Sequence, residues 1–253
     1  MSFDLTGRRA IVTGASSGIG RAIAIAFAAA GADVALLARD GETLAEVSAR
    51  VSEFGRLAVV LPTDVLDAEA TRASVAAAID ALGGLDIVVN NAGGNSFMWP
   101  AVSMRPAGWE RTLHLNLDSV FTVCQAAGPH LLAQGSGSVI NVASVAGHGA
   151  VPGMAHYAAA KAAVLSLTRT LAFEWAESGV RVNALTPGWI ETDLTDFLRT
   201  SGETEAGVLA GVPMHRWGQP HELAQPAVFL ASDASSFMTG QELVIDGGLL
   251  VAP

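Results

Sequence analysis

The chain has 253 residues, of which 51% are hydrophobic, and a formal net charge of −10 at pH 7. This length suits one domain with a substantial core, and the acidic balance argues against nucleic acid or an anionic membrane as a general partner. No apolar run of about eighteen residues lacks a glycine, charge or polar break, and the opening Met1–Asp4 has no basic stretch before an apolar segment. We therefore expect a cytoplasmic protein without a membrane span.

Short apolar segments of strand length alternate with longer helical patterns along the whole chain. Such alternation is typical of a parallel sheet whose strands are joined by crossover helices. No internal repeat, linker or change of composition marks a second domain. The pattern predicts a single α/β domain over residues 1–253, a doubly wound Rossmann-type parallel sheet of about seven strands with helices on both faces. The expected strands are Ala10–Val12, Val34–Ala38, Ala58–Leu61, Ile87–Asn90, Val139–Val142, Val182–Leu185 and Leu243–Ile245.

A glycine-rich turn follows the first expected strand. It contains Gly14, Gly18 and Gly20 and leads into an alanine-rich helix at Arg21–Ala30. Strand, glycine turn and helix favour phosphate binding, because glycine lets the backbone approach a pyrophosphate and the helix N-terminus attracts anions. The spacing departs from the Gly-x-Gly-x-x-Gly pattern, so a tight turn without a ligand is the other interpretation.

The second expected strand ends at Ala38-Arg39-Asp40. At this place an acidic residue would accept hydrogen bonds from an adenosine ribose, whereas an arginine would pair with a 2′-phosphate. Arg39 therefore favours NADP(H), and Asp40 is the rival that would favour NAD(H). A solvated Arg39 at the start of the next helix is the third interpretation.

Tyr157 is the only tyrosine, and Lys161 follows it by four residues in an alanine-rich segment that favours helix. That spacing puts the phenol and the ammonium on one helix face. Lowering the pKa of a phenol from about 10 to near 7 takes about 4 kcal/mol, which Lys161 and a second positive charge would supply. An oxidised nicotinamide ring carries such a charge, so the pair indicates proton transfer beside a dinucleotide.

Several motifs occur together in a fixed order, and in that order and spacing the chain resembles the short-chain dehydrogenase/reductase family from Leu5 to Gly248. The resemblance implies an NAD(P)-dependent oxidoreductase acting on CH–OH groups. The motifs are Thr13-Gly14-x-x-x-Gly18-Ile19-Gly20, Asn90-Asn91-Ala92-Gly93, Ser144, Tyr157-x-x-x-Lys161 and Pro187-Gly188.

The resemblance implies four catalytic residues. Tyr157 would move the proton to or from the substrate oxygen, Lys161 would lower the phenol pKa and hold the nicotinamide ribose, and Ser144 would bind the substrate oxygen. Asn116 would hold a water that relays protons to Lys161. Each of three residues also has a simpler interpretation when taken alone. Tyr157 would be a packed aromatic, Ser144 a loop serine, and Asn116 a buried polar side chain.

The resemblance also implies a cofactor site, and adjacency to it suggests a substrate pocket. Residues 191–218, an irregular mixture that includes Gly, Thr and Pro, would form a mobile flap over the substrate. Plain turns after strands are the alternative for Asn90-Asn91 and Pro187-Gly188. The cofactor residues are Gly14, Ser16, Ser17, Gly18, Ile19, Gly20, Arg39, Asp64, Val65, Asn91, Ala92, Gly93, Tyr157, Lys161, Pro187, Gly188, Ile190 and Thr192. The substrate candidates are Gly94, Asn95, Ser96, Ala146, His148, Met154 and Trp189.

The expected substrate is a small polar or cyclic secondary alcohol or ketone, with a sugar acid as one form. The alternative is a 3-oxoacyl thioester. Relatives that reduce such thioesters on an acidic carrier protein present basic residues where this chain has Leu132–Ser138 and Leu171–Trp175, which carry neither Lys nor Arg. Thioester binding would need basic residues elsewhere, such as Arg105, Arg111 or Arg169, to gather into a docking patch.

Other classes are less consistent with the residues. A non-catalytic NAD(P)-binding sensor or scaffold would have no need for both Tyr157 and Lys161. A serine hydrolase would require a Gly-x-Ser-x-Gly turn, which Ser144 lacks. The six histidines show no spacing typical of metal ligands, so no metal is expected. The resemblance further implies a homotetramer with a small-molecule substrate.

Overall fold

The computed structural model describes residues 3–200 and 202–252. Its centre is a seven-stranded sheet in the order β3-β2-β1-β4-β5-β6-β7, and every neighbouring pair is parallel. The predicted doubly wound fold is confirmed, and all seven predicted strands are present with ends that differ by at most two residues. The strands are β1 (Arg9–Thr13), β2 (Asp33–Ala38), β3 (Ala58–Pro62), β4 (Ile87–Asn90), β5 (Gly137–Val142), β6 (Val180–Pro187) and β7 (Glu242–Ile245).

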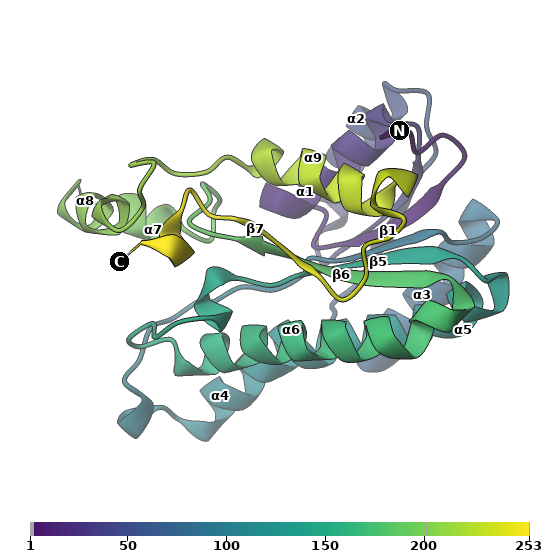
Figure 1. Cartoon of the computed structure of the whole chain (residues 1–253). Coiled ribbons are helices and arrows are strands. Elements are labelled where there is room, and N and C mark those ends of the chain that lie inside the picture. The colour runs from purple at the N-terminus through teal and green to yellow at the C-terminus, as the bar shows by residue number, and fades with distance from the viewer. Residues whose placement is uncertain (1–2, 201, 253) are drawn as a thin grey trace.

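Helices cover both faces of the sheet (Figure 1). One face carries α1 (Gly18–Ala29), α2 (Gly41–Ser52) and α9 (Pro220–Ala231). The other carries α3 (Ala68–Leu82), α5 (Ser119–Gln134) and α6 (Ala155–Trp175), and α4 (Pro106–Leu113) packs against α6. Alternate strand residues enter opposite cores: Ala10 and Val12 pack under α1 and α9, whereas Ile11 faces α3 and α5. Burial on both faces explains why the strands are continuous apolar runs.

The segment predicted as an irregular flap contains two helices, α7 (Asp196–Arg199) and α8 (Gly202–Ala210). Its base is closed by a parallel bridge between Ile190 and Gly218. Glu191 pairs with Arg199 and accepts a hydrogen bond of 2.6 Å from Gln219 Nε2. The flap therefore starts and ends at one point beside the carboxyl end of β6.

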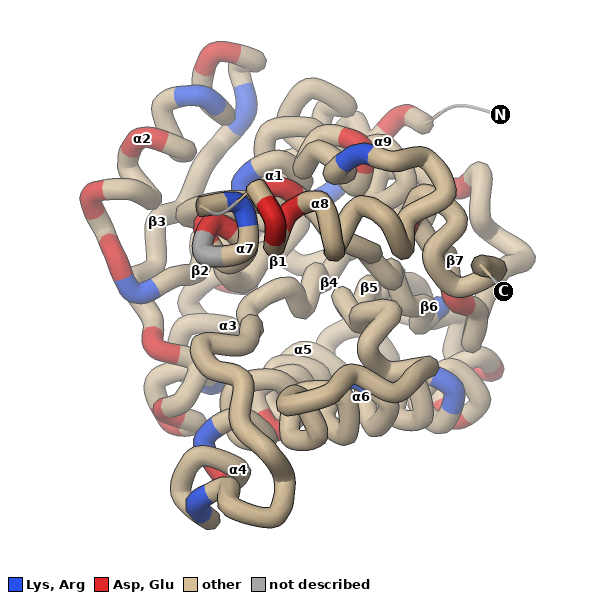
Figure 2. The backbone as a smooth tube through the Cα atoms, turned by 90° about the vertical axis from the view of Figure 1, so that its left-hand side faces the viewer, with Lys and Arg blue, Asp and Glu red and all other residues tan. Residues whose placement is uncertain are grey.

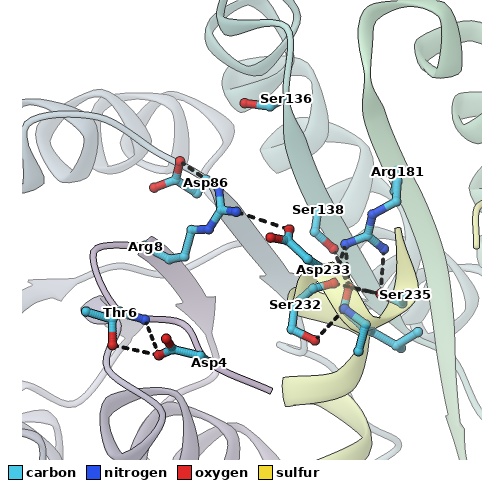
Figure 3. A network of polar contacts seen from close by, with 12 residues as sticks. Asp4, Thr6, Arg8, Asp86, Ser136, Ser138, Arg181, Ser232, Asp233 and Ser235 are labelled. Atoms are coloured by element: carbon cyan, nitrogen blue, oxygen red, sulfur yellow. Dashed lines mark hydrogen bonds and ion pairs between the residues drawn. The ribbon is translucent and has the colours of Figure 1, made fainter. Parts of the chain in front are cut away.

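Charged side chains close the amino ends of the strands (Figure 3). Arg8 lies 3.1 Å from Asp233 and 4.0 Å from Asp86, and Arg181 donates to Ser235 Oγ at 2.8 Å. We assign these contacts a structural role, because they lie at the amino ends of the strands, whereas the predicted site lies at the carboxyl ends. Within residues 3–200 and 202–252, no helix has both the length and the hydropathy needed to cross a bilayer.

Candidate active site

A cavity of about 1180 Å³ lies along the carboxyl ends of the strands. Its lining comes from the segments that follow β1 to β6, together with the flap and the Leu249–Val251 turn after β7. The topological switch point between β1 and β4 lies in this row of segments, which is where open α/β sheets bind ligands. The cavity exceeds the roughly 300–1,000 Å³ of a pocket for one small ligand, so it has room for a dinucleotide and a second molecule.

The turn between β1 and α1 depends on its glycines. Gly14 and Gly18 have φ of +63° and +51°, a left-handed conformation that favours glycine. A Cβ on Gly20 would lie 2.2 Å from the carbonyl oxygen of Gly14, so the helix can approach the turn only because residue 20 is glycine. Gly20 supports the turn from behind, whereas Ser16, Ser17, Gly18 and Ile19 line the cavity.

The N-terminus of α1 is free to bind an anion. Its N-cap residue, Ser17, makes no side-chain capping bond, and the first turn carries no acidic residue. The leading N–H groups of the helix therefore point toward the cavity without a side-chain partner, and the helix dipole favours negative charge there. The turn fits a pyrophosphate.

Thr13 ties the turn after β1 to the turn after β4. Its Oγ accepts hydrogen bonds of 3.0 Å from the N–H groups of both Asn91 and Ala92. In return, Asn91 Nδ2 donates to the carbonyl oxygens of Thr13 and Gly14 at 3.0 and 3.2 Å. Asn91, Ala92 and Gly93 thus line the cavity in a fixed conformation. Thr13 belongs to the glycine motif, but its role in joining the two turns has no local pattern, because Asn91 and Ala92 lie far along the chain.

The ends of β2 and β3 form the part of the cavity where adenosine was expected. Arg39 is exposed, lines the cavity and has no hydrogen-bond or ion-pair partner among the described residues. Asp40 is the N-cap of α2, and its carboxylate accepts from the N–H groups of Glu42 and Thr43 at 2.9 and 3.4 Å. The carboxylate of Asp40 is therefore engaged by the helix, and the guanidinium of Arg39 is not. Asp64 and Val65 line the same part of the cavity.

The three predicted catalytic side chains on β5 and α6 meet at the carboxyl end of β5. Lys161 is almost fully buried, and its Nζ donates to the carbonyl oxygen of Val142, the last residue of β5, at 2.8 Å. The same Nζ lies 5.7 Å from the centre of the Tyr157 ring. Ser144 follows β5, lies close enough to the Tyr157 phenol to affect its pKa, and accepts a hydrogen bond from the N–H of Ala146. The helical spacing of Tyr157 and Lys161 is as predicted.

Burial governs the charge state of this cluster. It raises the pKa of the Tyr157 phenol, and Ser144 opposes this only in part. It lowers the pKa of the Lys161 ammonium to about 8. In the chain by itself, burial of the phenol therefore dominates its pKa, and the predicted lowering by Lys161 together with a second positive charge stays a prediction. At neutral pH the phenol holds its proton and is arranged as a proton donor.

Asn116 lies in one π-helical turn, His114–Asp118, between α4 and α5. Its side chain is fully buried: Oδ1 accepts from Gly94 N at 2.8 Å, and Nδ2 donates to the carbonyl oxygens of Gly94 and Thr112 at 2.9 and 3.0 Å. A Cβ on Gly93 would lie 2.7 Å from Asn116 Oδ1 and 3.3 Å from Lys161 Nζ. Asn116 thus lies behind the cavity wall, next to Lys161, and holds the loop that carries Gly94.

Most, but not all, of the predicted substrate residues line the cavity. Gly94, Asn95, Ala146, Met154 and Trp189 do so. The other two predictions are wrong. His148 does not line it, because its Nε2 pairs with Glu242 Oε1 on β7 at 2.6 Å. Ser96 is exposed and also lies outside the lining.

The nicotinamide-side predictions and several unpredicted residues complete the lining. Pro187, Gly188, Ile190 and Thr192 are all present in it. Sequence reasoning missed apolar residues from the loops and the end of the chain, for which no local pattern exists: Met98, Val151, Leu194, Leu198, Val208, Leu249 and Leu250. Among residues 3–200 and 202–252, no three His, Cys, Asp or Glu side chains form a group that could hold a metal ion.

Comparisons with known proteins agree with this geometry. A family model described as Enoyl-(Acyl carrier protein) reductase matches residues 14–250. Gluconate 5-dehydrogenase of Gluconobacter oxydans (strain 621H) is 39% identical over 250 residues, covering 99% of this chain and 97% of that protein. The 3-oxoacyl-[acyl-carrier-protein] reductase of Thermotoga maritima is 38% identical over 247 residues, covering 98% and 99%.

A solved structure extends the likeness to three dimensions. Gluconate 5-dehydrogenase from Burkholderia cenocepacia J2315, in complex with NADP and tartrate, superposes with a TM-score of 0.93 at 39% identity and covers 99% of this chain and 98% of that one. This chain and that structure therefore share sequence and fold over nearly their whole length. The chain belongs to the short-chain dehydrogenase/reductase family and is an NAD(P)-dependent oxidoreductase.

Proposed function

We propose that the chain interconverts a small-molecule ketone and its secondary alcohol with NADP(H). The observation that carries this proposal is the meeting of Ser144, Tyr157 and Lys161 at the carboxyl end of β5, inside a cavity that continues to Arg39. β2 and β5 are three strand spacings apart, about 14 Å. One cavity thus spans from a catalytic cluster to an unpaired arginine, as an extended dinucleotide requires.

In the reduction direction, bound NADPH supplies a hydride to the carbonyl carbon. Tyr157 would donate its phenol proton to the carbonyl oxygen, which Ser144 Oγ would hold in place by a hydrogen bond. Lys161 would then restore the phenol proton, since its ammonium is protonated at neutral pH and lies on the same helix face. Positioned proton transfer of this kind typically contributes about 10²–10⁴-fold to the rate.

Two observations support NADP(H) over NAD(H). Arg39 and Asp40 both line the cavity, but the Asp40 carboxylate caps α2, whereas Arg39 has no hydrogen-bond or ion-pair partner among the described residues. The Burkholderia relative was solved with NADP. An arginine at this place would pair with the 2′-phosphate, because charge-assisted hydrogen bonds are stronger than neutral ones.

A small-molecule ketone is favoured over a carrier-bound thioester. The segments 132–138 and 171–175 lie at the ends of α5 and α6 and carry no Lys or Arg. The three arginines that would have to gather are dispersed: Arg105 and Arg111 lie on α4 or next to it, whereas Arg169 is about 18 Å along α6 from Tyr157. An acidic carrier would find no basic patch at these positions.

We also propose a homotetramer. Phe121 on α5 and Phe173 on α6 are 48% and 88% exposed, and β7 is an edge strand of the sheet with Val244 exposed. Exposed aromatic side chains and an uncovered edge strand are features of subunit interfaces. Light scattering that gives the mass of a monomer would contradict this.

The test is consumption of NADPH and NADH with a panel of ketones. Tyr157→Phe should lower kcat by about 10²-fold or more, with NADPH binding retained. Arg39→Ser should lower kcat/KM for NADPH by about tenfold and leave NADH unchanged, whereas Arg50→Ser on the exposed side of α2 should change neither. Cofactor binding without turnover on any ketone or alcohol would favour the sensor or scaffold instead.

A further inference from the structure

The substrate end of the cavity has apolar walls contributed by four separate segments. Beyond Ser144 and Tyr157, the lining includes Met98, Met154, Trp189, Leu194, Leu249 and Leu250. In Figure 2, the chain around the ends of β4 and β5 is almost free of charged residues, which lie mainly on the outer helices. Met98, Leu194 and Leu250 are 47%, 43% and 37% exposed, so this wall offers apolar surface to a ligand. Such a wall favours ligands that bring hydrocarbon surface against it.

Two polar side chains at this end, Asn95 and Thr195, already donate hydrogen bonds within the protein. Asn95 Nδ2 donates to the carbonyl oxygen of Phe97 at 2.7 Å, and its Oδ1 is buried without a hydrogen-bond partner. Thr195 Oγ donates to Ile190 O at 2.8 Å and accepts from Thr192 N at 3.1 Å. A sugar acid would bring a carboxylate and several hydroxyl groups, and each one left unpaired on burial costs about 1–3 kcal/mol. These walls therefore discriminate against a polyhydroxylated ligand.

The charged residues of the lining bear on whether a carboxylate substrate could bind. Among the described lining residues the cations are Arg39, Arg111 and Lys161. Arg39 lies at the far end of the cavity, and Lys161 is buried against Val142. Arg111 on α4 is exposed, and Asp193 in the flap brings a negative charge to the lining. Arg111 is therefore the one cation of the described lining that a carboxylate substrate could meet at this end, and Asp193 would oppose such a substrate.

The wall after β7 is held rigidly. Asp246 accepts hydrogen bonds from Gly248 N at 2.8 Å and Leu250 N at 2.7 Å. Gly247 and Gly248, with φ of +65° and +91°, allow the chain to turn back toward the cavity. A Cβ on Gly188 would lie 2.7 Å from Asp246 Cα, so this turn packs directly against the segment that leads to Trp189. Leu249 and Leu250 are thereby fixed in the lining of the cavity.

The flap completes the enclosure. A Cβ on Gly94 would lie 3.0 Å from Leu194 Cδ1, so Leu194 of the flap rests on the backbone of the loop after β4. Trp189 packs edge-on against Trp217, with ring centres 6.1 Å apart, and Trp217 donates to Glu205 on α8. The flap and the turn after β7 thus both contribute apolar side chains to the cavity lining.

We propose that the substrate is an uncharged, largely hydrocarbon ketone or secondary alcohol, and that Leu250, positioned by Asp246, selects it by contact. This inference rests on the proposed function, because it names the substrate class of the same site. It separates this chain from the relatives named for gluconate.

The experiment compares decalone, a bicyclic hydrocarbon ketone, with a keto-gluconate, using NADPH absorbance on the full chain. Decalone should be reduced with a kcat/KM roughly 100-fold higher. Leu250→Ser should lower kcat/KM for decalone about tenfold through KM, with kcat and NADPH affinity unchanged. Val251→Ser is the matched control, since Val251 is in the same turn but 85% exposed and outside the lining. It should change kcat/KM less than about twofold.

The inference would be overturned if the native chain preferred the keto-gluconate and Arg111→Ala lost that preference. The proposed function would remain intact. If no ketone is turned over, the proposed function fails, and quenching of tryptophan fluorescence by decalone still tests the wall, because Trp189 lines it. Quenching that weakens in Leu250→Ser but not in Val251→Ser would then support the substrate class. Absence of decalone binding in the native chain would refute it.

Discussion

The hydroxyl of Thr13 is the contact whose removal should be most informative. Thr13 is buried, and its Oγ uses its full bonding capacity: it donates to Val89 O at 3.3 Å and accepts from Asn91 N and Ala92 N. Thr13→Val keeps the shape and removes the oxygen. Two backbone N–H groups then lose their partner.

Each buried N–H left unpaired costs about 1–3 kcal/mol. Because Asn91 and Ala92 are only partly buried, we expect the lower part of the combined range, about 2–3 kcal/mol of unfolding free energy. Thr13→Ser keeps the oxygen and loses one methyl group, which should cost about 1 kcal/mol. Asn91 and Ala92 line the cavity, so NADPH affinity should fall in Thr13→Val and be preserved in Thr13→Ser.

Urea titration at a fixed protein concentration measures the free energy of unfolding, and fluorescence titration measures NADPH affinity. The reasoning is refuted if Thr13→Val is as stable as the native chain. It is also refuted if Thr13→Ser loses as much stability and NADPH affinity as Thr13→Val, because the oxygen would then be irrelevant.

Three further outcomes are expected. Gly20→Ala should weaken NADPH binding roughly 10-fold, because its Cβ would collide with backbone, whereas Gly207→Ala, where no atom lies within 4 Å, should leave it unchanged. Burial lowers the pKa of Lys161 to about 8, so kcat/KM for NADPH should decline as pH rises through about 8 and the ammonium loses its proton; a flat alkaline profile would contradict this role. Burial raises the pKa of Asp86, but hydrogen bonds from Arg9 and its charge outweigh this and hold the pKa below the ordinary 3.8. The stabilisation is therefore present above pH 3.8 and lost as pH falls through the folded pKa, so the stability difference between the native chain and Asp86→Asn should shrink on acidification.

Local sequence patterns were sufficient for the fold and for the spacing within single elements. The seven strands are short apolar runs because both faces of the sheet are buried, and the buried segments are recognisable without knowledge of their neighbours. Tyr157 and Lys161 share a helix face because they are four residues apart in a helix, whatever surrounds them. The glycine turn is equally local.

The choice between Arg39 and Asp40 depended on the start of α2. Both residues follow β2, and sequence alone left either able to meet an adenosine ribose. The helix uses the Asp40 carboxylate to satisfy its first N–H groups, and Arg39 is left toward the cavity. The sequence contains a local sign of this arrangement, because Asp is a preferred N-cap residue and Asp40 directly precedes α2 (Gly41–Ser52).

Three features were decided only by contacts between distant segments. Glu242 draws His148 away from the pocket across 94 positions of sequence, and Leu250 forms a pocket wall because Asp246 holds its turn beside Gly188. The phenol of Tyr157 is shifted upward in pKa by burial that no helical spacing reveals. Periodicity reports interactions within a few residues, whereas pocket walls, ion pairs and desolvation arise from whichever remote segments the sheet order brings together. For this chain, sequence determined the scaffold and the spacing of the proposed catalytic residues, and tertiary packing determined which side chains line the cavity.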